Sequence, residues 1–403
     1  MIATALILLL VLIGLSIPVG AALGVLGLTL DPLFSMLPLS RAIGELSWSS
    51  NNEFLLVAIP LFIMLGEVLL RANIGASTLF SATSGSSVAT AATVGTVAIP
   101  QIRKYGYNEP LFLGSLAAGG TLGILIPPSI NLVIYGVLTN SSVPKLYLAG
   151  IIPGFAMAAL FMLTVVIACV AKPSWGGKKI HATWGQRMAS LVHLAPPLGI
   201  FLLVVGSIYA GLATPTEAAA LGVLGALVLA AWYRRLTWNM LREAVEGTMR
   251  STAMIMLIVI AASFLNFVMS ATGLTDALTQ SITGLGLSPG WMLLIVIVFY
   301  LVLGCFMETL SMMITTIPIV APIMIGLGYD PIWLGIVIII LVEAALITPP
   351  VGLNLFVVQS LRKSGSMGAV IVGSLPFVLA MAVMLALLAW WPDVALWLPR
   401  AFG

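Results

Sequence analysis

A polar cluster in the middle of an apolar stretch is the part of the sequence best suited to bind an ion. Ser84, Gly85, Ser86 and Ser87 follow one another inside residues 75–100. Lipid offers no hydrogen bonds, so non-helical backbone at membrane depth must be buried in protein or line a wet cavity. Hydroxyl groups and free backbone carbonyls are hard oxygen ligands. We therefore predict that these four residues help to bind a small cation such as Na⁺.

A second apolar stretch, residues 291–324, carries a lone carboxylate near its middle. Glu308 is followed by Thr309 and Ser311. Ionisable groups inside a membrane are costly to bury and are functional candidates by default. We predict that these three residues belong to a second cation site, with pairing of Glu308 to a polar neighbour as the structural alternative. Both stretches are expected to be re-entrant hairpins that enter and leave the membrane on the same side.

Each hairpin is followed by an apolar segment that a Pro-Pro pair interrupts. Pro127-Pro128 and Pro349-Pro350 remove backbone donors and push the preceding residue out of helical geometry, which frees carbonyl groups. Because the break occurs after both hairpins, paired cation sites are favoured over two simple kinks. The ligands predicted beside the breaks are Pro127, Asn131, Thr348, Pro349 and Asn354.

An anionic substrate group would suit the N-terminal ends of the half-helices that follow the hairpin tips, where unpaired amides and the helix dipole favour negative charge. Thr214 and Thr216 are weaker candidates, because the sequence Thr214-Pro215-Thr216-Glu217 is typical of a helix N-cap with Pro at the first position. The residues predicted to contact substrate are Ser86, Ser87, Thr90, Glu308, Thr214 and Thr216.

The remaining reactive side chains favour no enzyme. Glu67 and Glu343 lie within apolar runs, as packing contacts or as part of a proton or ion route. The cysteines and histidines are Cys169, Cys305, His181 and His193, and they fit neither a disulfide framework nor a metal centre. A hydrolase built on the serine cluster would need a histidine at membrane depth. We expect no catalytic residue, no metal centre and no organic cofactor.

Membrane-spanning helices must hold these candidates in place. Of the 403 residues, 61% are hydrophobic and 7% are charged, against roughly 25% charged residues in a soluble domain. The fold class expected is therefore an all-α polytopic protein of the lipid bilayer, with about ten spans plus the two hairpins. No nucleic-acid partner is expected. The predicted spans are residues 2–15, 18–30, 55–70, 110–137, 146–170, 194–213, 218–232, 252–270, 331–358 and 370–390.

The basic residues give the orientation of these spans. With two re-entrant hairpins, 13 of the 16 Lys and Arg residues share one face, which is then cytoplasmic, and both termini lie outside. Residues 2–15 have no basic residue before them and are expected to be a retained span. One long tilted helix is the alternative to two spans over residues 2–30. Residues 238–250 mix apolar and charged residues and predict a cytoplasmic surface helix.

The chain also contains an internal repeat. Five anchors recur at a single displacement of 222 positions: Pro100, Gly106, Tyr107, Pro127 and Pro128 correspond to Pro322, Gly328, Tyr329, Pro349 and Pro350. The turn after the first hairpin is basic and the matching turn is not, so the copies should face opposite ways. Inverted repeats with discontinuous helices are typical of alternating-access transporters. The first copy is shorter by roughly two dozen residues after Ile74, which leaves residues 75–83 too short for a complete first hairpin arm.

These observations divide the chain into five parts. The two inverted repeats occupy residues 54–142, with hairpin 75–100 and broken helix 110–137, and residues 251–363, with hairpin 291–324 and broken helix 331–358. The other parts are N-terminal spans with a surface arm (1–53), linking spans with the surface helix (143–250), and a C-terminal span with a tail (364–403).

Several motifs together resemble the DctM-like large subunit of TRAP transporters, along nearly the whole chain. They are AIPLFIMLGE (58–67), SGSS (84–87), IPPS (126–129), ATPTEAA (213–219) and TPPVGLN (348–354). The resemblance implies a multi-pass subunit of the bacterial inner membrane that imports small organic acids, driven by Na⁺ as coupling ion. It also implies a small four-helix membrane partner and a periplasmic substrate-binding protein. The same resemblance implies sodium sites between hairpin tips and broken helices, with Ser84–Ser87 beside the Pro127 region and Glu308–Ser311 beside the Pro349 region.

Two other functions stay open. A single-component symporter for sodium and dicarboxylates shares the inverted repeats and hairpins but needs no binding protein. The shortened first repeat makes an inactive or structural subunit the other alternative. The particular carboxylate, whether a C4-dicarboxylate or another, is not readable from the residues, since in such systems the binding protein largely sets specificity.

Overall fold

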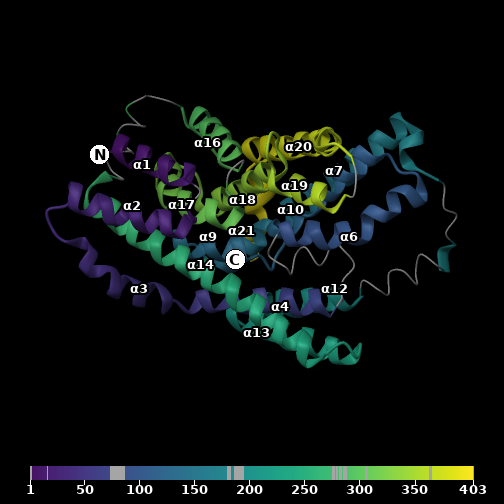
Figure 1. The fold of residues 1–403 in the computed structure, drawn as a ribbon, viewed down its shortest axis with the longest axis horizontal. Helices are drawn as coiled ribbons and strands as arrows, with labels where there is room; N and C mark the ends of the chain where they lie inside the picture. The colour runs from purple at the N-terminus through teal and green to yellow at the C-terminus, as the bar shows by residue number, and fades with distance from the viewer. Residues whose placement is uncertain are drawn as a thin grey trace.

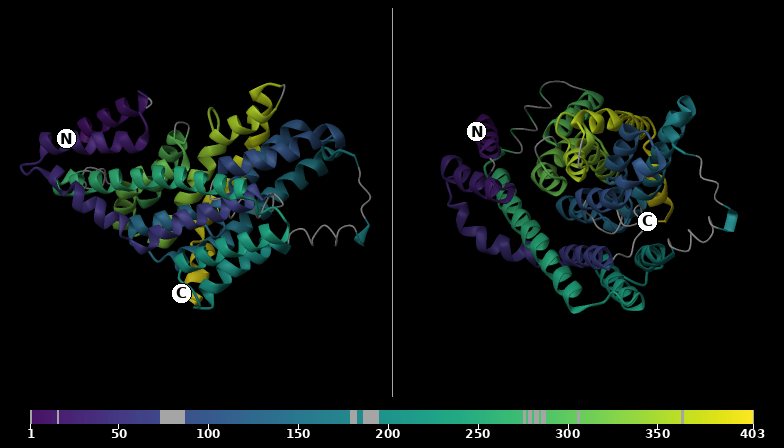
Figure 2. Two further views of the ribbon diagram at one scale, coloured as in Figure 1. Left: turned by 60° about the horizontal axis from the view of Figure 1, so that its bottom comes forward. Right: turned by 45° about the vertical axis from the view of Figure 1, so that its right-hand side comes forward.

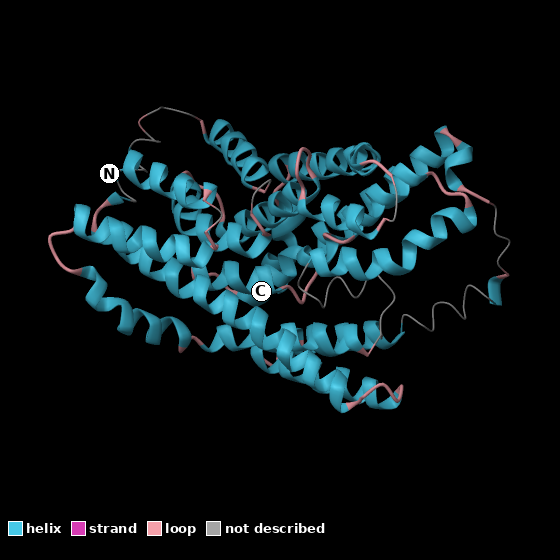
Figure 3. Cartoon of the chain, in the orientation of Figure 1, coloured by secondary structure: helices cyan, strands magenta, loops and turns pink. Residues whose placement is uncertain are grey.

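Every regular element in the described part of the chain is a helix (Figure 3). The structure is a computed structural model, and it describes residues 2–15, 17–72, 87–178, 183–185, 195–274, 277, 280, 284, 288–304, 307–362 and 365–402. The predicted all-α class is confirmed.

Six of the described helical stretches are long and apolar enough to cross a membrane. A seventh span forms if the bent pair Glu109–Leu125 and Ile130–Thr139, which meet at 47°, counts as one. Shorter apolar helices account for most of the remaining predicted spans, because a break or a short loop divides them below span length. The six are Phe54–Arg71 (η2 Phe54–Val57 and α4 Ala58–Arg71), α10 Val143–Ala171, α13 Pro215–Trp232, α14 Trp238–Ala271, α17 Thr309–Gly326 and α20 Met367–Trp390.

The N-terminal region holds two helices rather than one. Helix α1 (Ile2–Gly14) ends before Pro18, and α2 (Val19–Phe34) begins directly after it and packs against α1. Proline is well placed at the entrance of a helix, where its missing N–H is no loss. The prediction of two segments over residues 2–30 is confirmed.

Helix α14 corrects the prediction of a separate surface helix. The sequence predicts a surface helix that ends near Arg250 and a span that begins at Thr252, whereas the structure has one continuous helix, Trp238–Ala271, of 34 residues. No glycine or proline stands between the two predicted segments to end the helix. At 1.5 Å per residue the helix is about 51 Å long, so the proposed division after residue 250 falls inside it.

The internal repeat is visible as matching elements. Helices α6 (Ser87–Tyr105) and α17 (Thr309–Gly326) begin 222 positions apart. The first broken helix consists of α7 (Glu109–Gly119), α8 (Leu122–Leu125) and, after the break, α9 (Ile130–Thr139); its counterparts are α18 (Pro331–Ile347) and α19 (Leu353–Leu361). The break falls at the Pro-Pro pair in both copies, as predicted.

The two copies exchange their second half-helices. Helix α19 packs against α6 and α7 of the first copy, and α9 packs against α17 and α18 of the second. The outer ends of these contacts are tied by polar pairs: the Tyr135 hydroxyl donates to the Pro331 carbonyl at 2.6 Å, and Arg362 pairs with Glu109 at 2.7 Å. Each hairpin arm therefore lies beside the broken helix of the other repeat.

The helices form two groups. The repeats, with α10, α16 (Pro289–Leu303), α20 and α21 (Asp393–Phe402), make a compact core. Helices α2, α3 (Ile43–Asn51), α4, α12 (Ala195–Tyr209), α13 and α14 pack on one another along one side of it (Figures 1 and 2). An ion pair between Arg71 of α4 and Glu243 of α14, at 2.6 Å, ties this second group together.

Candidate functional site

The Pro-Pro breaks have the same backbone conformation in both repeats. Ile126 has φ −82° and ψ 125°, and Thr348, its counterpart 222 positions later, has φ −86° and ψ 128°. A proline disfavours the helical conformation of the residue before it, so the helices end where the sequence predicts. The next peptide bond, between the two prolines, is cis in both repeats. Thr348 uses its hydroxyl to donate to the Ala344 carbonyl at 2.6 Å.

The first polar cluster is described from its last residue onward. Ser84, Gly85 and Ser86 lie outside the described residues. Ser87 begins α6 and is buried, and Thr90 is buried one turn later.

Asn354 connects this helix start to both repeats. It lies in the first turn of α19, is fully buried, and its side-chain amide donates to the Ser87 hydroxyl and to the Ala117 carbonyl at 3.2 Å. Because a carbonyl is only an acceptor, the contact with Ala117 fixes which end of the asparagine is nitrogen. The side-chain carbonyl oxygen, Oδ1, then points elsewhere and has no hydrogen-bond donor among the described residues. The predicted pairing of Ser87 with the Pro127 region is corrected here: the residue bonded to Ser87 is Asn354, which follows Pro349, because the half-helices after the breaks pack on the opposite repeat.

The second hairpin tip packs closely on α18. A Cβ added to Gly304 would overlap the Ala345 side chain and lie 3.0 Å from its Cα. Beyond the tip, the Glu308 carboxylate caps α17 by accepting from the backbone amides of Leu310 at 3.2 Å and Ser311 at 3.4 Å. The Thr309 hydroxyl donates to the same carboxylate at 2.9 Å. The structural alternative for Glu308 is thus present, and a carboxylate with several lone pairs keeps room for a further partner.

Asn131 takes the place of Asn354 in the other repeat: each is the second residue of its half-helix, and the two are 223 positions apart because the second break is one residue longer. Asn131 lies in the first turn of α9, which packs against α17, and is 1% exposed. Neither end of its amide has a hydrogen-bond partner among the described residues. Buried polar groups in proteins are nearly always paired, so this amide is a candidate for binding a ligand.

Ser129 stabilises the first Pro-Pro break, although it was not among the predicted ligands. Its hydroxyl donates to the Ile124 carbonyl and accepts from the Leu132 amide at 3.4 Å, so it caps α9 and bridges the break. A serine directly after a Pro-Pro pair and before an apolar run is an N-cap signal. The Ala117 carbonyl, by contrast, has no sequence signal at all, because only the exchange of half-helices brings it to Asn354.

Thr214 and Thr216 have local roles. Thr214 and Glu217 form the predicted capping box: the Thr214 amide donates to the Glu217 carboxylate at 2.7 Å, and the Glu217 amide donates to the Thr214 hydroxyl at 3.3 Å. Thr216 donates to the Phe54 carbonyl at 3.2 Å. Helix α13 packs mainly on α4, α12 and η2. A contact of these two threonines with substrate stays a prediction.

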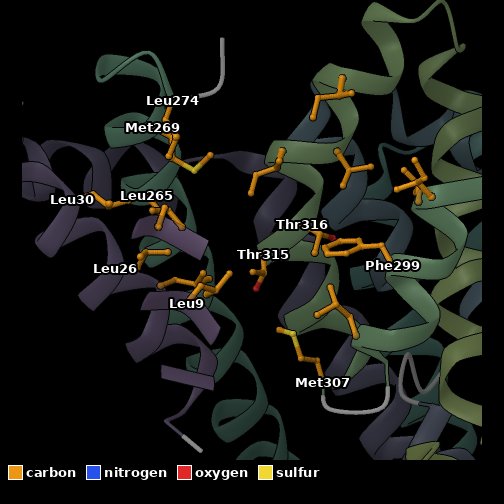
Figure 4. A pocket seen from close by; sticks show the side chains of 18 of the residues that line it. Leu9, Leu26, Leu30, Leu265, Met269, Leu274, Phe299, Met307, Thr315 and Thr316 are labelled. Atoms are coloured by element: carbon orange, nitrogen blue, oxygen red, sulfur yellow. The ribbon is translucent and has the colours of Figure 1, made fainter. Parts of the chain in front are cut away.

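A cavity of about 340 Å³ lies away from these polar groups. It is lined on one side by α1, α2 and α14 and on the other by α16 and α17 (Figure 4). Leucine, methionine and isoleucine side chains make up most of its wall, with Thr315 and Thr316 as the polar members. Thr316 is already bonded to the Tyr300 hydroxyl at 2.6 Å. Such a wall offers a carboxylate almost no donors, so the cavity does not coincide with the predicted site.

Comparisons with known proteins agree with the arrangement of repeats and breaks. Residues 70–394 match the family described as "Tripartite ATP-independent periplasmic transporter, DctM component". The C4-dicarboxylate TRAP transporter large permease protein DctM of Pseudomonas aeruginosa is 32% identical over 398 residues, with 90% of each chain covered. The sialic acid TRAP transporter large permease protein SiaM of Vibrio cholerae is 30% identical, with 87% of each chain covered.

A solved structure has a similar fold. The YdaH transporter of Alcanivorax borkumensis, described as having an unusual topology, superimposes with a TM-score of 0.59 over 95% of this chain and 97% of that one, at 16% identity.

The alignment with the Pseudomonas protein also bears on length. The alignment has 398 positions, but the 90% of this chain that it covers contains fewer than 398 residues. That relative therefore has residues with no counterpart here, and their place after Ile74 stays a prediction.

Proposed function

Because the chain belongs to the DctM family of large permease subunits of TRAP transporters, we propose that it imports a small carboxylate in symport with Na⁺ by alternating access. The family is one of multi-pass membrane transport permeases. Its relatives are named for different substrates, among them C4-dicarboxylates and sialic acid. The carboxylate group is what these two substrates share, so we place the proposed specificity at that chemical class.

The observation that carries sodium coupling is a pair of free oxygens. Asn131 and Asn354 are both buried, one in the first turn after each break, and within the described part of the chain the side-chain oxygen of each lacks a donor. Each lies on a half-helix that packs against the hairpin arm of the opposite repeat. A side-chain amide oxygen is a suitable ligand for a hard cation. Two such oxygens in repeat-related places support two Na⁺ sites.

The hairpin tips complete these proposed sites. Ser87 is held beside Asn354, whereas Glu308, Thr309 and Ser311 form the start of α17, which faces α9. A movement that separates a hairpin arm from the opposite half-helix would take the ligands apart. Binding of Na⁺ is therefore expected to favour the packed arrangement, since a ligand shifts an equilibrium towards the state that it binds better.

We also propose two partners and a location. A small four-helix membrane subunit and a periplasmic substrate-binding protein would complete the transporter, and the bacterial relatives favour the inner membrane. A single-component symporter is the competing function, and dependence on the binding protein separates the two.

The test is uptake into proteoliposomes. The subunit is reconstituted with its small membrane partner, and uptake of labelled carboxylates is measured with and without the binding protein and with an inward Na⁺ or K⁺ gradient. We expect uptake that needs both Na⁺ and the binding protein. Asn354→Ala should raise the Na⁺ concentration for half-maximal uptake by about tenfold or more, since a bond to a charged group contributes about 1.5–3 kcal/mol.

An exposed asparagine provides the matched control. Asn52→Ala, at the end of α3, should leave the Na⁺ dependence unchanged. Equal uptake in K⁺ and Na⁺ would overturn sodium coupling, and uptake without the binding protein would support the single-component alternative. Absence of all uptake, restored by inserting a relative's longer segment before Ser87, would show an inactive subunit.

A further inference from the structure

Glu343 is the carboxylate that the proposed sodium sites leave unexplained. It lies on α18, five positions before the break residue Thr348, and has 0% of its surface exposed. Neither carboxyl oxygen has a hydrogen-bond partner in the part of the chain that the structure describes. Its counterpart in the first repeat, 222 positions earlier, is Thr121, whose hydroxyl is satisfied by the Ala118 carbonyl at 2.8 Å. The acid is thus particular to the second copy.

The surroundings of Glu343 come from the first break. The neighbouring polar group is the backbone amide of Leu125, the last residue of α8, which faces the carboxyl without completing a hydrogen bond. Helix α10 closes the same place, because a Cβ added to Gly150 would lie 2.7 Å from the Leu125 carbonyl. The carboxyl is therefore enclosed where α8, α10 and α18 meet.

No charge on the described part of the neighbouring helices compensates Glu343. Among the described residues, burial and the nearby Leu125 amide are the main influences on its carboxyl. Asp393 and Arg400 of α21 pair with each other, and Lys145 is exposed at the start of α10. The titratable groups on helices that pack against α18 are Tyr135, Lys145, Tyr147, Cys169, Tyr300, Asp393 and Arg400.

An isolated ionised carboxylate cannot stay in such a place. Its transfer from water to an apolar interior is strongly unfavourable, and real groups avoid this by becoming neutral. A bound cation would need several oxygens that converge on it. The polar group beside Glu343 is an N–H, which repels a cation. A proton satisfies the carboxyl with no further ligand.

We propose that Glu343 is a proton-binding site that holds its proton while α18 is packed on the first break. The proton leaves to water, and the carboxylate forms, when the contact between α18 and α8 opens. Protonation is thereby linked to the separation of the two broken helices. This inference does not depend on sodium coupling, because the protonation state is measurable without transport.

The first experiment is infrared difference spectroscopy of the purified subunit at neutral pH. The C=O stretch of a protonated carboxyl is separate from the carboxylate bands and shifts in ²H₂O and with ¹³C-glutamate labelling. We expect wild type to show a ¹³C-sensitive band of one carboxyl group that Glu343→Gln lacks. Glu67→Gln is the matched control, since Glu67 is ion-paired with Arg71 at 2.9 Å, and it should keep the band. Absence of any protonated glutamate band in labelled wild type would overturn the proposal, even if Glu343→Gln failed to fold.

The second experiment tests the link to opening. Leu125→Cys is introduced into a chain with Cys169→Ala and Cys305→Ala, and its reaction with a thiol reagent is followed from neutral to alkaline pH. Leu125 is buried, so reaction reports opening. At the same alkaline pH, we expect at least several-fold faster labelling with Glu343 than with Glu343→Gln, which stays neutral. Equal rates in both backgrounds would overturn the link between protonation and packing.

Discussion

Replacing Asn131 by leucine should make the chain more stable in the absence of Na⁺. Asn131 is 1% exposed, and neither end of its amide is hydrogen-bonded to any described residue. A buried polar group left unpaired costs about 1–3 kcal/mol, and leucine fills a similar volume without polar atoms. No partner loses a hydrogen bond in this substitution. The free energy of unfolding of Asn131→Leu without Na⁺ should therefore exceed that of wild type by about 1–3 kcal/mol.

Sodium should remove this advantage. A ligand that binds only the folded chain stabilises it by about 2.7 kcal/mol at 100 times its dissociation constant. If the side-chain oxygen of Asn131 is a ligand, wild type gains this stability and Asn131→Leu loses the share that belongs to this site. The two free energies of unfolding should then become equal or change order as Na⁺ replaces K⁺.

The assay is thermal unfolding in detergent, followed by tryptophan fluorescence, in NaCl and in KCl at the same ionic strength. The control is Asn52→Leu, which changes an exposed asparagine and should keep the full response to Na⁺. The reasoning is refuted if Asn131→Leu unfolds at a lower temperature than wild type in KCl. It is also refuted if NaCl raises the unfolding temperatures of both proteins equally.

Two further substitutions test the contacts around the site. Gly304→Ala should destabilise the chain by about 1–3 kcal/mol, because its Cβ would overlap Ala345 under the second hairpin tip. The control is Gly326→Ala, whose added Cβ would have nothing within 4 Å, so it should be neutral or stabilising by up to about 1 kcal/mol. Similar unfolding temperatures for the two variants would contradict the packing of the tip. Thr214→Ala should cost about 0.5–2 kcal/mol of stability through loss of the capping box with Glu217. The predicted contact of Thr214 with substrate requires that the same variant raise the KM in the uptake assay, and an unchanged KM would contradict that contact.

The local part of the fold was predictable because local rules decide it. The Pro-Pro pairs end their helices through a steric effect on the preceding residue. Ile126 and Thr348 therefore take the extended conformation without help from distant parts of the fold. The capping box at Thr214 likewise needs only residues within one turn. The single displacement of 222 positions predicts that the two Pro-Pro breaks lie in equivalent elements, because equivalent sequences form equivalent elements.

The contacts between repeats were not predictable from one sequence. The bond from Asn354 to Ser87 joins residues 267 positions apart, and no local pattern specifies which repeat a half-helix will join. The continuity of α14 was not predicted for a different reason. Amphipathic and apolar segments lie at different places relative to a membrane, but a change of composition does not by itself end a helix. The burial of Glu343 depends on α8 and α10, so its lack of partners is a property of the assembled core.

The exchange of half-helices has a consequence for biosynthesis. Ser87 of α6 cannot contact Asn354 of α19 until the 267 positions that separate them have been synthesised. At a translation rate of 5–20 residues per second, this takes about 15–50 s. During this interval the ribosome-bound chain exposes the Ser87 hydroxyl and the Ala117 carbonyl without their later partner. A nascent chain halted before α19 should therefore be open to proteases and to membrane chaperones at α6, however well its own helices have inserted. Native structure in the amino-terminal half would then be acquired only when synthesis is nearly complete.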